Sequence, residues 1–160
     1  MTLSELESTL QRVTDSIGGM APGPELMALL NERFGRSSET FTRLAEICRE
    51  GMNSGWLCQR EHGGIRYGRV IEAGPELSGY SVDVVYMNDV RGPYHRHPNG
   101  ELDLVLPVDD GAKFDGHGAG WVVYDAESAH YPTVTGGAAF VLYLLPGGAI
   151  DFKAKPPVSG

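Results

Sequence analysis

The spacing of apolar residues divides the chain into two parts, with a change of period near Gly55. In residues 2 to about 51, apolar side chains recur at intervals of three and four, which is the pattern of amphipathic helices. After Gly55, glycines become frequent and the apolar residues fall in short runs between turn residues, which is typical of strands. The pattern predicts an N-terminal helical segment (1–54), a β-domain packed with it as one unit (55–153) and a loose tail (154–160).

Three helices are predicted in the N-terminal segment. Each begins at a capping residue or a proline suited to the first turn, and each ends at glycine. Their apolar stripes are interpreted as packing surfaces, which either cover a sheet or form a subunit contact. The expected limits are Thr2 or Ser4 to Gly18-Gly19, Pro24 to Gly35, and Ser37-Ser38-Glu39-Thr40 to Gly51.

In the second part, the apolar pattern predicts many short strands at nearly regular spacing. Turn residues such as Gly136-Gly137 separate them, and this arrangement indicates a β-sandwich or a β-barrel. The fold class is therefore mainly β. The expected strands are 65–71, 80–87, 94–97, 101–108, 120–124, 130–135 and 138–145, with a weak one at 150–152.

Composition narrows the possible partners and the compartment. The 160 residues suit one domain, and the formal net charge of −8 argues against nucleic acid or an anionic membrane surface as partner. A small anionic substrate remains compatible with a few local arginines. Cys48 and Cys58 do not form a disulfide framework, and neither a leader nor a membrane span is evident. We therefore expect a soluble, cytoplasmic protein with reduced thiols.

Two histidines and a carboxylate in the middle of the chain are the most informative residues. Side chains two apart on a strand share a face, so His95 and His97 project together. The turn signal Pro98-Asn99-Gly100 lets the chain reverse, and Glu101 then begins the next strand. Two imidazoles and one carboxylate thus converge, as a divalent metal requires, and His130 offers a third imidazole.

This ligand set predicts one divalent metal ion. Mixed nitrogen and oxygen ligands suit Zn, Fe, Mn or Ni, and the sequence does not choose among them. Two alternatives stay open. The four side chains could be polar groups satisfied inside a barrel, or they could line a pocket that has lost its metal.

The pattern His95-x-His97-x-x-x-Glu101, followed by His130 near a later strand, resembles the two cupin motifs. The resemblance covers residues 60–153. It implies a jelly-roll-like cupin β-barrel, here with an N-terminal α-helical segment. Cupins are often dimers, so the resemblance also implies a homodimer, for which the helical stripes could supply the interface.

A closer resemblance covers nearly the whole chain. It is with the small cupin-like family that includes 4-hydroxylaminobenzoate lyase, which forms protocatechuate and ammonium. This resemblance implies a carbon–nitrogen lyase whose substrate is a small aromatic acid. The segments that carry it are Gly55-Trp56-Leu57-Cys58, Gly64-Ile65-Arg66-Tyr67-Gly68-Arg69-Val70, His97-Pro98-Asn99-Gly100-Glu101 and Leu142-Tyr143-Leu144-Leu145-Pro146.

Candidate catalytic groups follow from the same strands. Asp103 shares the strand parity of Glu101, so it is expected to face the same interior, as a partner of a ligand histidine or as a proton carrier. The alternative is an exposed residue at the edge of the sheet. Tyr143 and Tyr124 are further candidates for the catalytic acid.

Candidate substrate-binding groups include two arginines on one predicted strand. The planar guanidinium of Arg66 or Arg69 would bind a carboxylate, but the two lie on opposite faces, so at most one points inward. The alternative is an ion pair, for which Asp83 is available. Tyr67, with the parity of Arg69, and Tyr94 are candidates for contacts with an aromatic ring.

The leading hypothesis is a redox-neutral lyase acting on an aryl hydroxylamine carboxylate. A metal and an acid would assist cleavage of the N–O bond, water would add and ammonia would leave. One alternative is a metal-dependent cupin dioxygenase or isomerase on another aromatic acid, which oxygen consumption would reveal. The other is a small-molecule-binding cupin without catalysis, which a lack of turnover would favour.

Overall fold

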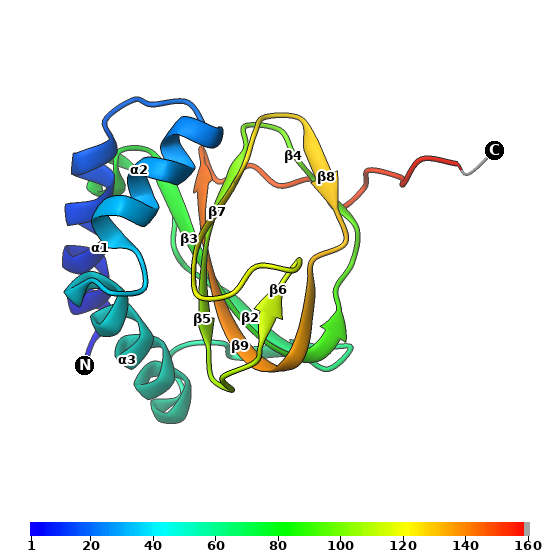
Figure 1. The fold of residues 1–160 in the computed structure, drawn as a ribbon, viewed down its shortest axis with the longest axis horizontal. Helices are drawn as coiled ribbons and strands as arrows, with labels where there is room; N and C mark the ends of the chain where they lie inside the picture. Colours follow the sequence, from blue (N-terminus) through cyan, green and yellow to red (C-terminus); the bar gives the residue numbers. More distant parts are fainter. Residues whose placement is uncertain (159–160) are drawn as a thin grey trace.

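The computed structural model describes residues 1–158 and confirms a mainly β fold with an N-terminal helical segment (Figure 1). The helices are α1 (Leu3–Ile17), α2 (Pro24–Phe34) and α3 (Glu39–Ser54), and a 3₁₀ turn, η1, spans Pro75–Leu77. The strands are β1 (Arg60–His62), β2 (Ile65–Ile71), β3 (Tyr80–Arg91), β4 (His95–His97), β5 (Glu101–Pro107), β6 (Lys113–Phe114), β7 (Gly120–Tyr124), β8 (Ser128–His130) and β9 (Thr133–Pro146).

The strands form two antiparallel sheets. The large sheet has the order β1-β2-β3-β9-β5-β7, with β6 added on β9, and the small sheet consists of β4 and β8. Among the described residues the large sheet has free ends at β1 and β7, so it is jelly-roll-like but not closed by hydrogen bonds into the expected barrel. Figure 1 shows the helices on one side of it and the β4–β8 pair on the other.

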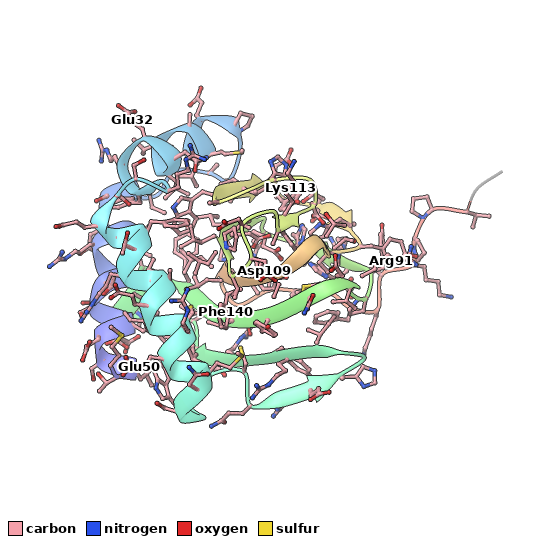
Figure 2. All side chains as sticks on the ribbon, turned by 60° about the horizontal axis from the view of Figure 1, so that its bottom comes forward. Glu32, Glu50, Arg91, Asp109, Lys113 and Phe140 are labelled. Atoms are coloured by element: carbon pink, nitrogen blue, oxygen red, sulfur yellow. The ribbon has the colours of Figure 1, made fainter. Side chains whose placement is uncertain are left out.

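The large sheet buries both of its sides. The helix-facing side packs against α1, α2 and α3, and Phe140 lies in this layer beside α3 (Figure 2). The inner side faces the β4–β8 pair and carries a second apolar cluster that includes Val105, Val141 and Phe114. The apolar stripes of the helices therefore cover a sheet, as one of the two interpretations expected. Within residues 1–158, no helix is both long enough and apolar enough to cross a bilayer.

Caps set most helix limits as the sequence predicts. The hydroxyl of Thr2 accepts a hydrogen bond from the amide of Glu5, and Ser38 does the same for Phe41. The prediction that Gly51 ends the third helix is wrong, because α3 continues to Ser54. Gly51 is instead a packing position: a Cβ there would lie 2.5 Å from Cδ1 of Leu57.

The strand predictions are correct at β2 and β7 and wrong around β8 and β9. His130 ends β8 rather than opening a strand, because Pro132 lacks an amide hydrogen and separates β8 from β9. Gly136 and Gly137 do not turn the chain; they lie within β9, opposite a register shift in β3 between Asn88 and Val90. The short strands β1 and β6 were not predicted, and the expected strand at 150–152 is a single bridge of Asp151 to Arg96.

Candidate metal centre

Strand pairing brings the candidate ligands together from three elements. In the β4–β8 pair, His95 lies directly opposite His130. The tight turn after His97 ends at Gly100, whose φ is +90° and whose Cβ position is 2.8 Å from the carbonyl oxygen of Tyr124, so only glycine fits there. The turn delivers Glu101 to the first position of β5.

The four ligand atoms share one small space. The Nε2 atoms of His97 and His95 lie 3.0 and 3.4 Å from Oε2 of Glu101. His130 Nε2 is 3.9 Å from Glu101 Oε1 and 3.1 Å from His95 Nε2. All four ligand atoms lie within 4.8 Å of one another. His97 and Glu101 are fully buried.

The opposite nitrogen of each imidazole has a hydrogen-bond acceptor. His95 Nδ1 lies 3.3 Å from the carbonyl oxygen of Pro93. His97 Nδ1 lies 2.9 Å from the Ser128 hydroxyl, which itself donates to a backbone carbonyl. His130 Nδ1 lies 2.5 Å from a carboxylate oxygen of Asp115. With the hydrogen of each ring on Nδ1, each Nε2 would direct a lone pair at the centre.

These residues fit a divalent metal ion. His97 Nε2 and both oxygens of Glu101 are buried without an aligned hydrogen-bond partner. Nitrogen lone pairs that face a carboxylate repel it unless a cation lies between them. Three histidines and one glutamate form a ligand set that can coordinate Zn, Fe, Mn or Ni.

Asp103 lies two residues along β5 from Glu101, on the inner side of the sheet, as its parity predicts. It is fully buried, and both of its oxygens lack a hydrogen-bond partner. Burial and the charge of Glu101 raise the pKa of Asp103 well above its ordinary value. Tyr143 lies directly opposite Asp103 on β9, and burial likewise raises the pKa of its hydroxyl. Both shifts favour the protonated forms of these groups.

The two arginines lie on opposite sides of the large sheet. Arg69 is on the inner side, where its guanidinium contacts Asp83 at 3.2 Å and the carbonyl oxygen of Gly148 at 3.1 Å. Arg66 is paired in register with Tyr86 on the helix-facing side, so the structure does not bring it to the histidines. Of the two arginines, of which the sequence expected at most one to point inward, Arg69 is the inward one, but it already carries the ion pair that the sequence offered as the alternative.

The predicted tyrosines differ in their relation to the centre. The ring of Tyr124 lies 4.6 Å from that of His130 and 5.3 Å from that of His97, between centroids. Tyr94 alternates with His95 along the chain, so it projects from the other face and packs against Tyr131. Tyr67 lies on the inner side of β2 and is 36% exposed.

Sequence reasoning did not identify Asp115 and Ser128, whose oxygens lie at Nδ1 of two candidate ligand histidines. Asp115 follows β6, whose pairing with β9 brings it to His130, and Ser128 lies opposite His97 in the β4–β8 pair. Both positions depend on long-range pairing. The only local signal was Asp115-Gly116, a turn dipeptide.

A jelly-roll-like sheet that gathers His-x-His-x₃-Glu and a later histidine at one buried centre defines a cupin. The particular family is shown by comparison of sequences: the model of the 4-hydroxylaminobenzoate lyase (PnbB) family matches residues 8–152. The chain belongs to this family.

Two relatives carry the name 4-hydroxylaminobenzoate lyase. The protein from Nocardioides sp. (strain LMS-CY) is 40% identical over 144 residues, which cover 84% of this chain and 85% of that one. The protein from Pseudomonas putida is 37% identical over 145 residues, covering 79% and 82%. The similarity therefore extends over most of each protein.

Solved structures show a distant likeness. The DMSP lyase DddQ from Ruegeria pomeroyi DSS-3 gives a TM-score of 0.44 at 14% identity, covering 95% of this chain and 98% of that one. An oxalate oxidase in complex with the substrate analogue glycolate gives 0.41 at 16% identity, covering 58% and 57%. Such values say nothing of function.

Proposed function

We propose that this chain converts 4-hydroxylaminobenzoate, or a related aryl hydroxylamine carboxylate, to protocatechuate and ammonia. Membership of the 4-hydroxylaminobenzoate lyase family supports the substrate class. The observation that carries the proposal is the buried convergence of three imidazoles and Glu101 in a chain that matches the family from residue 8 to residue 152.

The overall reaction balances without an oxidant or reductant. The substrate gains one water and loses one ammonia, and the N–O bond breaks as the catechol oxygens are installed. Three changes are needed: the N–OH oxygen leaves with a proton as water, a water adds at the neighbouring ring carbon, and a second water hydrolyses the imine at the original carbon. A divalent metal held by His95, His97, Glu101 and His130 would supply Lewis-acid polarisation of the leaving oxygen.

The proton for the leaving oxygen is assigned to Asp103. Its carboxyl group is fully buried on the inner side of β5, two residues from the candidate ligand Glu101, and within residues 1–158 neither of its oxygens has a hydrogen-bond partner. A proton carrier in that position can protonate the leaving oxygen as the N–O bond breaks. Tyr143, which lies directly opposite on β9, is assigned to hold the substrate or to pass a proton to Asp103.

Isotope labelling under anaerobic conditions tests the proposal. With metal-loaded protein in oxygen-18 water, we expect protocatechuate that carries two labelled hydroxyl oxygens, together with one ammonia per turnover. A single label would mean that the hydroxyl group migrates directly from nitrogen to carbon and would remove water addition from the mechanism.

Two other outcomes would replace the proposed function. A requirement for molecular oxygen, with label from that source in the product, would indicate a cupin dioxygenase. Absence of turnover of any aryl hydroxylamine by metal-loaded protein, with retained binding of the aromatic acid, would indicate a binding protein.

A further inference from the structure

We propose that Asp115 is a positioning residue, which holds His130 in the one tautomer that can bind a metal. The inference concerns the metal centre alone. It does not depend on which reaction the centre performs.

The contacts of Asp115 leave His130 a single role for each ring nitrogen. Oδ2 of Asp115 lies 2.5 Å from His130 Nδ1. Because an ionised carboxylate only accepts hydrogen bonds, Nδ1 must carry the hydrogen. Nε2 then keeps its lone pair, which points to the space shared with His95 and Glu101.

The carboxylate of Asp115 is itself fixed by two further donors. Its Oδ2 also accepts a hydrogen bond from the Tyr124 hydroxyl at 2.5 Å, and its Oδ1 accepts one from the backbone amide of Thr133 at 2.9 Å. Because two donors other than His130 already point at it, the carboxylate of Asp115 is a hydrogen-bond acceptor with a fixed orientation.

The backbone around Asp115 is built to present this side chain. The residue has a φ of +49° and is followed by Gly116 at +82°, within a tight turn in which the backbones of Phe114 and His117 are hydrogen-bonded to each other at 2.8 Å. Its own amide donates to the carbonyl of Thr133 at 2.8 Å. A residue with a side chain adopts such a φ at an energetic cost. Here this backbone conformation directs the carboxylate of Asp115 toward His130.

Asp115→Asn is the informative substitution because it keeps the shape and replaces one acceptor oxygen by a donor. If the amide oxygen stays on the Thr133 amide, the new NH₂ group faces His130 Nδ1. That nitrogen must then accept, so the hydrogen moves to Nε2 and blocks the metal position. We expect metal affinity to fall about 10–100-fold, as when an outer-sphere partner of a ligand histidine is lost.

Asp109→Asn is the matched control. Asp109 lies in the loop before β6, and its Oδ2 accepts a hydrogen bond at 2.7 Å from the amide of Ala138, also on β9. Like Asp115, Asp109 thus accepts a hydrogen bond from a backbone amide of β9, but within residues 1–158 its side chain has no hydrogen bond to a histidine. Thermal unfolding of both variants compares their structural costs.

Two measurements decide the proposal. Long-range proton–nitrogen NMR of the metal-free protein reports the tautomer of His130, which we expect to be Nδ1–H in the wild type and Nε2–H in Asp115→Asn. Titration with Zn²⁺ or Co²⁺ reports affinity, and the Co²⁺ absorption spectrum reports geometry; both should change in Asp115→Asn and stay near wild type in Asp109→Asn.

An Nε2–H tautomer in the metal-free wild type would overturn the proposal, and this test stands even if Asp115→Asn fails to fold. Equal Zn²⁺ affinities for a folded Asp115→Asn and the wild type would overturn it as well.

Discussion

Strands β5 and β9 have two buried sides with opposite chemistry. On the helix-facing side, Leu102, Leu104, Leu142 and Leu144 are fully buried among the leucines of the helices. On the inner side, the same strands carry the candidate ligand Glu101 and two other buried residues with polar groups, Asp103 and Tyr143. Because side chains alternate along a strand, the leucines of β5 and β9 face the helices, and the ionisable groups of the same strands face the inner side.

The difference shows why the helical segment is needed. A buried carboxylate without a partner costs several kcal/mol, which reduces the stabilisation that the inner side gains from apolar residues such as Val105 and Val141. Burial of apolar side chains under α1, α2 and α3 offsets that cost at about 25 cal/mol per Å². We therefore expect substitutions on the two sides to separate function from stability.

The largest functional effect is expected for Glu101→Gln. The change keeps the shape but removes the charge that a divalent cation requires, so metal binding should be lost and the rate should fall about 10³-fold, as the several kcal/mol supplied by a metal imply. Elemental analysis and an ammonia-release assay measure both. Glu127→Gln, at an exposed glutamate paired with Arg96, is the control. A Glu101→Gln protein that keeps its metal would contradict the ligand assignment.

The largest stability effect is expected for Leu104→Ala on the opposite side of β5. Leu104 is fully buried, so the variant should lose about 2–5 kcal/mol of unfolding free energy through lost apolar burial and a cavity. The metal affinity of the folded protein should change little. Urea unfolding and Zn²⁺ titration of the same sample measure the two effects. A fall in affinity as large as that of Glu101→Gln would show that the two sides are not separable.

A smaller loss of stability is expected for Gly51→Ala within α3. The added Cβ would lie 2.5 Å from Cδ1 of Leu57, and such overpacking costs about 1–3 kcal/mol. Gly19→Ala is the control, because its Cβ would meet nothing within 4 Å. Thermal unfolding compares them. Equal melting temperatures would mean that α3 does not pack against the segment after it as described.

The smallest effect is expected at the arginines of β2. Arg69→Gln breaks the ion pair with Asp83 on the inner side, at a cost of about 1 kcal/mol or less, whereas Arg66→Gln on the other side breaks no ion pair in residues 1–158. If Arg69 also binds the substrate carboxylate, KM should rise in Arg69→Gln alone. A rise in KM confined to Arg66→Gln would show that the inner side is not the substrate side.

Three members of the candidate ligand set could be brought together from sequence because their geometry is local. The period of a strand fixes His95 and His97 on one face, and the turn at Gly100 fixes Glu101 beside them. Limits marked by caps, such as Ser38, were predictable for the same reason. The inward direction of Asp103 also followed from parity.

The remaining features depend on contacts between distant segments. Asp115 meets His130 because β6 pairs with β9, and Gly51 lies inside α3 at a position where Leu57 packs closely against it. The open edges at β1 and β7 likewise depend on which strands pair. Spacing in the sequence carries no record of these pairings.

The most direct test of the central claim is metal titration of chelator-treated protein during ammonia release from 4-hydroxylaminobenzoate. If His95, His97, Glu101 and His130 hold one catalytic divalent ion, activity should return in proportion to added metal and reach its limit at one equivalent per chain. Full activity in protein stripped of metal, or a site that binds no cation at any concentration, would contradict it.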